Sequence, residues 1–113
     1  MRILFLGDVV GNSGITKLAE NLPFQKKQRE IDFVIVNGEN ADETGVGLTK
    51  KICEKFFSIG VDVITTGNHV WDQNDIMNFI ENEKRLLRPK NFYEPSPGKG
   101  FEIFTTSNNY KIG

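Results

Sequence analysis

The hydrophobic positions of this chain fall into short apolar runs separated by longer stretches with helical spacing. Three runs have the length of β-strands, and we predict strands at residues 2–7, 32–37 and 61–66. The second run places four apolar residues, Phe33 to Val36, in succession without alternation. Such a run is typical of a parallel strand that is buried on both faces.

A helical pattern follows the first predicted strand. We predict a loop at residues 11–14, which include two glycines, and a helix that begins at about Ile15 with Leu18 and Leu22 on one face. Pro23 is expected to interrupt this helix, because proline cannot donate the helix hydrogen bond.

Two further helices are predicted after the second and third strands. Thr49 is a good cap for a helix over residues 50–59, whose apolar stripe includes Cys53. Asp72 is the expected cap of a helix over residues 73–82.

The remaining residues predict little regular structure before a final hairpin. Residues 84–100 hold three of the four prolines and are expected to be irregular. Residues 101–105 alternate like a half-buried strand, and a turn at 107–109 leads into a return strand. The order is therefore β-α-β-α-β-α followed by a β-hairpin, which predicts an α/β fold with a mainly parallel sheet.

Composition narrows the classes of protein that this chain can be. With 113 residues it has room for one domain, and 14 Lys and Arg against 15 Asp and Glu give a net charge of -1. No basic field is available to bind duplex nucleic acid, and no apolar run is long enough for a membrane span. A single cysteine excludes an internal disulfide and a thiolate zinc cluster, and we expect a cytoplasmic protein.

Polar side chains with metal-binding capacity follow each of the three predicted strands. Asp8 follows the first, Glu39 and Asn40 follow the second, and Asn68 and His69 follow the third. The carboxyl ends of parallel strands share one edge of a sheet, where α/β proteins bind ligands. Oxygen ligands and imidazole suit divalent metals such as Mn or Fe, and two such metals make a site that cleaves phosphoesters.

Each cluster alone also has a structural interpretation. Asp8 can be a turn residue, Glu39 and Asn40 a solvated turn, and a single histidine such as His69 a hydrogen-bonded structural residue. The glycines of residues 7–14 match neither the dinucleotide-binding nor the P-loop spacing. The joint placement of three clusters at equivalent strand ends is what favours a metal site.

These loops are similar to motifs of a known family. The sequence closely resembles the YmdB-like branch of the calcineurin-like metallophosphoesterases, in order and spacing along the whole chain. The motifs that carry this resemblance are Gly7-Asp8-Val9-Val10-Gly11, Asn37-Gly38-Glu39-Asn40-Ala41, Thr66-Gly67-Asn68-His69-Val70-Trp71-Asp72, Arg88-Pro89-x-Asn91-Phe92 and Pro97-Gly98-Lys99-Gly100.

The resemblance implies a metal-dependent phosphodiesterase of 2′,3′-cyclic nucleotides or related phosphodiesters, in which a hydroxide bridging two metals, Fe or Mn, is the nucleophile. It implies roles for five residues: Asp8 as a ligand of the first metal, Glu39 as a bridge between both, Asn40 as a further ligand of the first, Asn68 as a ligand of the second, and His69 as the proton donor to the leaving oxygen.

The resemblance also implies that residues 1–113 are the N-terminal part of a single domain, namely one half of a layered metallophosphoesterase sandwich. The family's second half supplies three further histidine ligands, and this chain contains only His69. Two hypotheses follow. The chain is active when a second half is present, in the same chain or as a partner chain, or it is an inactive remnant that binds at most one metal weakly. An uncovered sheet face would also favour homo-oligomers.

Overall fold

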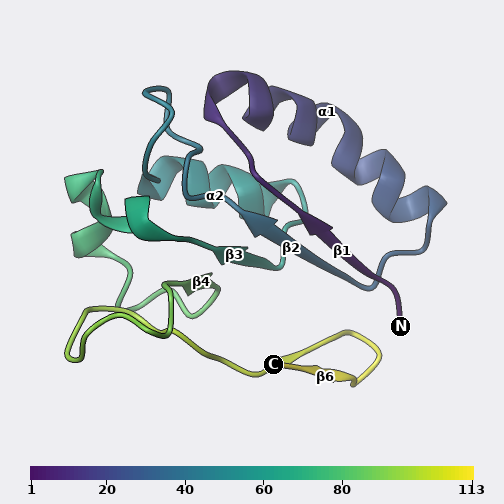
Figure 1. The fold of residues 1–113 in the computed structure, drawn as a ribbon. Coiled ribbons are helices and arrows are strands. Elements are labelled where there is room, and N and C mark those ends of the chain that lie inside the picture. Colours follow the sequence, from purple (N-terminus) through teal and green to yellow (C-terminus); the bar gives the residue numbers. More distant parts are fainter.

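The computed structural model describes residues 1–113 as an α/β fold with a four-stranded parallel sheet in the order β1-β2-β3-β4 and a separate antiparallel hairpin (Figure 1). The sheet strands are β1 (Ile3–Leu6), β2 (Phe33–Asn37), β3 (Val63–Thr65) and β4 (Leu86–Leu87), and the hairpin strands are β5 (Phe104–Thr105) and β6 (Lys111–Ile112). The α-helices are α1 (Gly11–Gln28) and α2 (Lys50–Ser58), and two 3₁₀ helices span Asn68–Trp71 and Asn74–Asn78. The predicted fold class is thereby confirmed.

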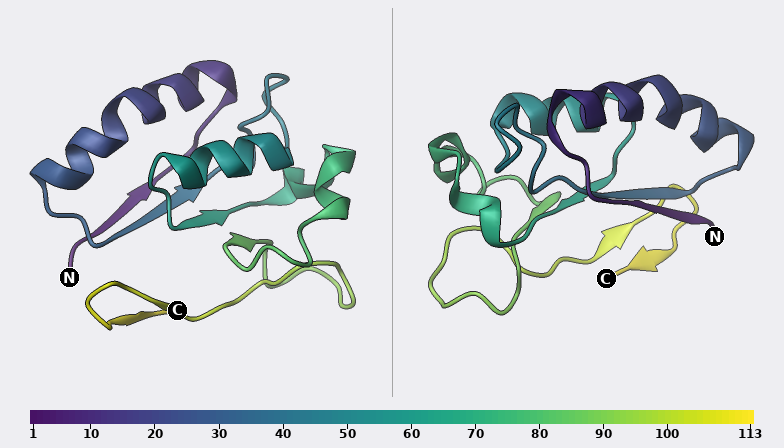
Figure 2. Two further views of the ribbon diagram at one scale, coloured as in Figure 1. Left: turned by 180° about the vertical axis from the view of Figure 1, so that it is seen from behind. Right: turned by 45° about the horizontal axis from the view of Figure 1, so that its top comes forward.

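Both α-helices cover the same face of the sheet (Figures 1 and 2). On this face Val34, Val36 and Ile64 have no exposed surface, and Phe56 of α2 is equally buried. The strands pair in parallel register, with Leu4 opposite Val34 and Val36 opposite Ile64. This continuous apolar contact is the core of the molecule.

The opposite face of the sheet is covered only in part. The hairpin lies beneath it (Figure 2), and the ring of Phe104 lies 5.9 Å from the ring of Phe33, measured between centroids. Ile3 and Phe5 keep 45% and 61% of their surface exposed. Parallel sheets are normally covered on both faces, whereas these two apolar side chains remain accessible on this one.

The first helix differs from the prediction at both its start and its length. It begins at Gly11, which has a φ of +59°, so residues 11–14 belong to the helix and do not form a loop. It also continues through Pro23. Proline removes one helix hydrogen bond, but Leu18 and Leu22 anchor the preceding turns in the core, with 8% and 2% exposure.

The predicted helix over residues 73–82 is also wrong, since a 3₁₀ helix, Asn74–Asn78, replaces it. Asp72 does not cap this helix. Ile76, Phe79 and Ile80 are nevertheless buried as expected. Apolar residues at spacings of three and four can point inward from short 3₁₀ turns as well as from an α-helix, which explains the error.

Strand β4 was not predicted because two residues carry no periodic signal. Arg88, which follows it, holds the irregular segment in place and is only 4% exposed. Its guanidinium donates to four acceptors, the carbonyl oxygens of Pro89, Ser96 and Pro97 and the carboxylate of Glu94. The backbone N–H of Arg88 also donates to Lys99 O at 2.9 Å.

The second helix agrees with the prediction. The Thr49 hydroxyl accepts a hydrogen bond from the N–H of Ile52 at 3.4 Å, as expected of a cap. Cys53 lies in the core with 2% exposure, and burial raises the pKa of its thiol well above the usual range. None of the helices combines the length and the apolar character that a membrane span requires.

The packing of α2 predicts that replacing phenylalanine by alanine affects the free energy of unfolding very differently at two positions. Phe56→Ala removes a side chain with 0% exposure and should lower the free energy of unfolding by about 3–5 kcal/mol. Phe24→Ala removes a ring that is 62% exposed and should change it by about 0.5 kcal/mol or less. Urea denaturation measures both, and the milder Phe56→Leu serves if Phe56→Ala does not fold. Equal losses at the two positions would contradict this core.

Candidate functional site

Three loops meet at the carboxyl edge of the sheet, because β1, β2 and β3 are parallel neighbours. Backbone hydrogen bonds continue from the sheet into these loops. Val9 N donates to Asn37 O at 3.1 Å, and Gly38 N donates to Thr65 O at 3.0 Å. The loops that carry Asp8, Glu39–Asn40 and Asn68–His69 are thus held side by side, as the sequence pattern predicts.

The first two loops are joined by their side chains. Asn40 Nδ2 donates to Asp8 Oδ2 at 2.6 Å, and Gly11 N donates to Asn40 O at 2.9 Å. The side-chain oxygen of Asn40, Oδ1, is buried and has no hydrogen-bond partner. Asn40 Oδ1 is therefore a free acceptor that lies beside the exposed carboxylate of Asp8.

The carboxylate of Glu39 lies against the backbone of the third loop. A Cβ atom built on Gly67 would lie only 2.0 Å from Glu39 Oε2, so the approach requires glycine at this position. Glu39 Oε2 is buried and, like Asn40 Oδ1, has no hydrogen-bond partner. Orphaned buried oxygens are costly and rare, and they fit a site in which a cation accepts their electron pairs.

The third loop is a 3₁₀ helix, Asn68–Trp71, with Asn68 exposed at its first position. His69 Nδ1 lies 2.6 Å from Asp72 Oδ2, and both side chains are partly exposed. This partner was missed because Asp72 was interpreted as a helix cap. The His-x-x-Asp spacing was the available signal, since residues three apart share one face of a helical turn.

The donor set suits a hard divalent cation but is small. No three His, Cys, Asp or Glu side chains of this chain come together as a metal-binding group. The predicted ligands instead combine two carboxylates, Asp8 and Glu39, with two amides, Asn40 and Asn68. Carboxylate and amide oxygens are acceptable ligands of Mn²⁺ and similar ions, so the residues present fit part of a metal site.

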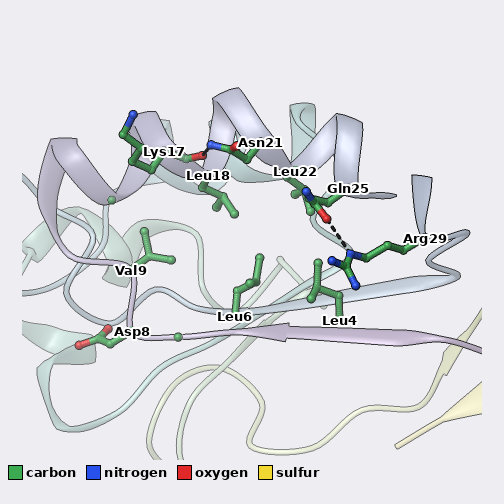
Figure 3. Close-up of a pocket in the computed structure, with 12 residues that line it drawn as sticks. Leu4, Leu6, Asp8, Val9, Lys17, Leu18, Asn21, Leu22, Gln25 and Arg29 are labelled. Carbon is green, nitrogen blue, oxygen red and sulfur yellow. Dashed lines mark hydrogen bonds between the residues drawn. The ribbon is translucent and has the colours of Figure 1, made fainter. Parts of the chain in front are cut away.

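The molecule also contains a groove beside the first helix. It has a volume of about 550 Å³ and lies between β1 and α1, with Leu4, Leu6, Leu18 and Leu22 among its lining residues (Figure 3). Asp8 stands at one end, with its carboxylate pointing away from the helix. Of the candidate site residues only Asp8 lines this groove, and Glu39, Asn40 and His69 lie outside it.

Two solved structures have the same fold as this chain. A hypothetical protein from Thermus thermophilus aligns with a TM-score of 0.87 at 36% identity, over 95% of this chain and 41% of that protein. A crystal structure described as a novel phosphatase, from Mycoplasma pneumoniae, aligns with a TM-score of 0.83 at 39% identity, over 90% of this chain and 37% of that one. The fold is therefore shared with a protein described as a phosphatase.

Sequence comparison identifies the family. Residues 4–113 match the family described as YmdB-like protein, and the chain belongs to it. The chain is also 49% identical to the 2′,3′-cyclic-nucleotide 2′-phosphodiesterase of Bacillus subtilis (strain 168) over 100 residues. These residues cover 88% of this chain and 38% of that relative. The family is thus one of phosphodiesterases and phosphatases, and the chain spans about two fifths of the length of the relatives it matches.

The contact between Gly67 and Glu39 predicts a substitution that changes the site without unfolding the protein. A methyl group in Gly67→Ala must displace the Glu39 carboxylate, but the carboxylate is the end of a flexible side chain. The melting temperature should therefore change little, whereas Mn²⁺ binding measured by calorimetry should weaken by about tenfold or more.

Gly45→Ala is the matched control for that experiment. No atom lies within 4 Å of a Cβ built there, but the φ of +84° makes alanine strained. It should lower the melting temperature and leave Glu39 in place. An unchanged Glu39 amide resonance in Gly67→Ala would contradict the contact described here.

Proposed function

We propose that this chain carries half of the catalytic centre of a metal-dependent phosphodiesterase acting on 2′,3′-cyclic nucleotides or related phosphodiesters. The observation that carries the proposal is the pair of orphaned buried oxygens, Glu39 Oε2 and Asn40 Oδ1, at the edge where three loops meet. The substrate class follows from the name of the Bacillus relative, which is 49% identical in the matched region.

The proposed metal ligands are distributed over the three loops. Asp8 and Asn40 would hold one divalent ion, Asn68 would hold a second, and Glu39 would contribute to both. We expect Mn or Fe, because the donors proposed in this chain are oxygens and those expected in the second half are imidazoles. When bound, such ions supply Lewis-acid stabilisation of phosphoryl charge and lower the pKa of water.

His69 is proposed as the general acid that protonates the leaving oxygen. Its Nδ1 is engaged by Asp72 Oδ2 at 2.6 Å, which orients the ring and leaves Nε2 as the nitrogen that can face the substrate. Asp72 is therefore proposed as the residue that positions His69.

The proposed centre needs more ligands than this chain contains. Two metals take about four to six ligands each, and only four donors are assigned here. We propose that the remaining ligands come from polypeptide equivalent to the rest of the longer relatives, in the same chain or in a partner chain. The apolar face bearing Ile3 and Phe5 provides a surface against which it would pack.

A second candidate function rests on the absence of any group of three His, Cys, Asp or Glu side chains. In this alternative the 113 residues form an inactive remnant that binds at most one metal weakly. Activity with and without complementing polypeptide separates the two functions.

We expect residues 1–113 alone to hydrolyse bis-p-nitrophenyl phosphate or 2′,3′-cyclic AMP at trace rates with Mn²⁺ or Fe²⁺. Co-expression with the part of the Bacillus relative that lies beyond the matched region should raise the rate well above that of an Asp8→Ala chain purified in the same way. Full activity of residues 1–113 alone would show that the second half is dispensable. No gain on complementation would favour the inactive remnant.

In the complemented enzyme, His69→Ala should lower turnover of 2′,3′-cyclic AMP by about 10²–10⁴-fold with little change in metal content. The loss should be smaller for bis-p-nitrophenyl phosphate, because p-nitrophenolate leaves without protonation. Asn68→Ala should instead reduce the content of one metal, and exposed Asn74→Ala is its control. Loss of metal in His69→Ala, with equal slowing of both substrates, would contradict the acid role.

A further inference from the structure

The side chain of Gln73 joins the loop after β2 to the turn after β3. Its Nε2 lies 2.9 Å from Val46 O, 3.2 Å from Asp42 Oδ1 and 3.3 Å from Thr44 Oγ1. All three acceptors belong to the segment that follows Glu39 and Asn40. Gln73 itself comes directly after Asp72, the partner of His69. One amide group therefore contacts a loop more than 25 residues away in the sequence.

One of the acceptors of Gln73 is the carboxylate of Asp42, which is nearly buried. Asp42 is only 9% exposed, and its Oδ1 accepts hydrogen bonds from Thr44 N at 3.0 Å, from the Thr44 hydroxyl at 2.8 Å and from Gln73. A carboxylate that is largely removed from water depends on such donors. Loss of the Gln73 donor would leave Asp42 with Thr44 alone.

Backbone contacts extend this link to Glu39. Gly47 has a φ of +83°, and a Cβ there would lie 2.7 Å from Gln73 Cγ, so backbone and side chain are closely packed. Gly47 N donates to Glu39 O at 2.6 Å, and Asp42 N donates to Gly47 O at 3.0 Å. The segment from Glu39 to Gly47 is therefore a closed loop whose far side rests on Gln73.

We propose that Gln73 is a positioning residue that fixes Glu39 relative to His69. On one side it holds the loop 39–47 through three acceptors, and on the other it is covalently attached to Asp72, which orients His69. Sites built from separate loops need such support, because displacements of about 0.5 Å are enough to disturb metal or catalytic geometry. The catalytic meaning of this link rests on the proposed function, whereas the link itself can be tested without it.

The chemistry of the amide explains why glutamine suits this position. Glutamate would have the same shape but would place a second carboxylate against Asp42 and remove both N–H donors. Methionine would keep the length and most of the volume but would leave Val46 O and Asp42 Oδ1 without this donor. Gln73→Glu and Gln73→Met therefore separate charge repulsion from loss of hydrogen bonds. Exposed Asn74→Ala is the matched neighbour control.

Amide hydrogen exchange followed by NMR tests the link in residues 1–113 without metal. In both Gln73 variants the N–H groups of Asp42 and Gly47 should exchange about tenfold faster or more, while those of the core strand residues Val34 and Val36 change by less than about twofold. Asn74→Ala should match the wild type. Unchanged exchange at Gly47, or equal acceleration in the core strands, would overturn the proposal.

Residual dipolar couplings test positioning itself, which a general loss of stability would not alter selectively. In the wild type, the N–H couplings of residues 39–47 and 68–72 should fit one common orientation. In Gln73→Glu each segment should fit alone but not together with the other. A common fit in this variant would overturn the positioning role. Neither measurement depends on turnover, so failure of the proposed phosphodiesterase activity leaves this result intact, and the reverse also holds.

Discussion

Burial of β2 between two parallel neighbours is the constraint on which the rest of this structure depends. Val34 and Val36 have no exposed surface, and the strand pairs with β1 on one side and β3 on the other. Parallel direction makes the three strands end at the same edge. The apolar packing that stabilises the fold thus also brings Asp8, Glu39 and Asn68 to one edge of the sheet.

The same edge contains the least satisfied polar groups of the molecule. Glu39 Oε2 and Asn40 Oδ1 are buried without hydrogen-bond partners, although other polar groups around them are well bonded. Folding tolerates such groups where function requires them. Gly67 makes the arrangement possible, because any side chain at that position would occupy the place of the Glu39 carboxylate. The lack of a side chain at Gly67 is therefore what allows the Glu39 carboxylate to lie in the candidate site.

Two other features are consistent with a site that is completed by further polypeptide. The helices cover one face of the parallel sheet, while the hairpin covers the other only in part and leaves Phe5 61% exposed. The ligand set likewise contains four oxygen donors and no cluster of three acidic, histidine or cysteine side chains. The proposed second half would supply apolar cover and imidazole ligands together, which gives both deficits one explanation.

Local pattern was sufficient for the elements whose burial is strong and regular. The run Phe33 to Val36 predicted the central strand, and Thr49 with the apolar stripe of α2 predicted that helix. The order of strands and helices then predicted the correct edge of the sheet for the candidate ligands. This worked because hydrophobic periodicity and strand direction are properties that a sequence encodes directly.

The remaining features were decided by tertiary contacts. Leu22 packs in the core, and α1 continues past Pro23. The hydrogen bonds of Arg88 hold a segment that has no hydrophobic periodicity. Asp72 has the local preference of a cap, yet its partner is His69, and Gln73 finds its acceptors in a loop that is distant in sequence. The sequence alone determined the fold class and the candidate ligands. Only the tertiary structure decided their hydrogen-bond partners, because these depend on how the loops approach one another in space.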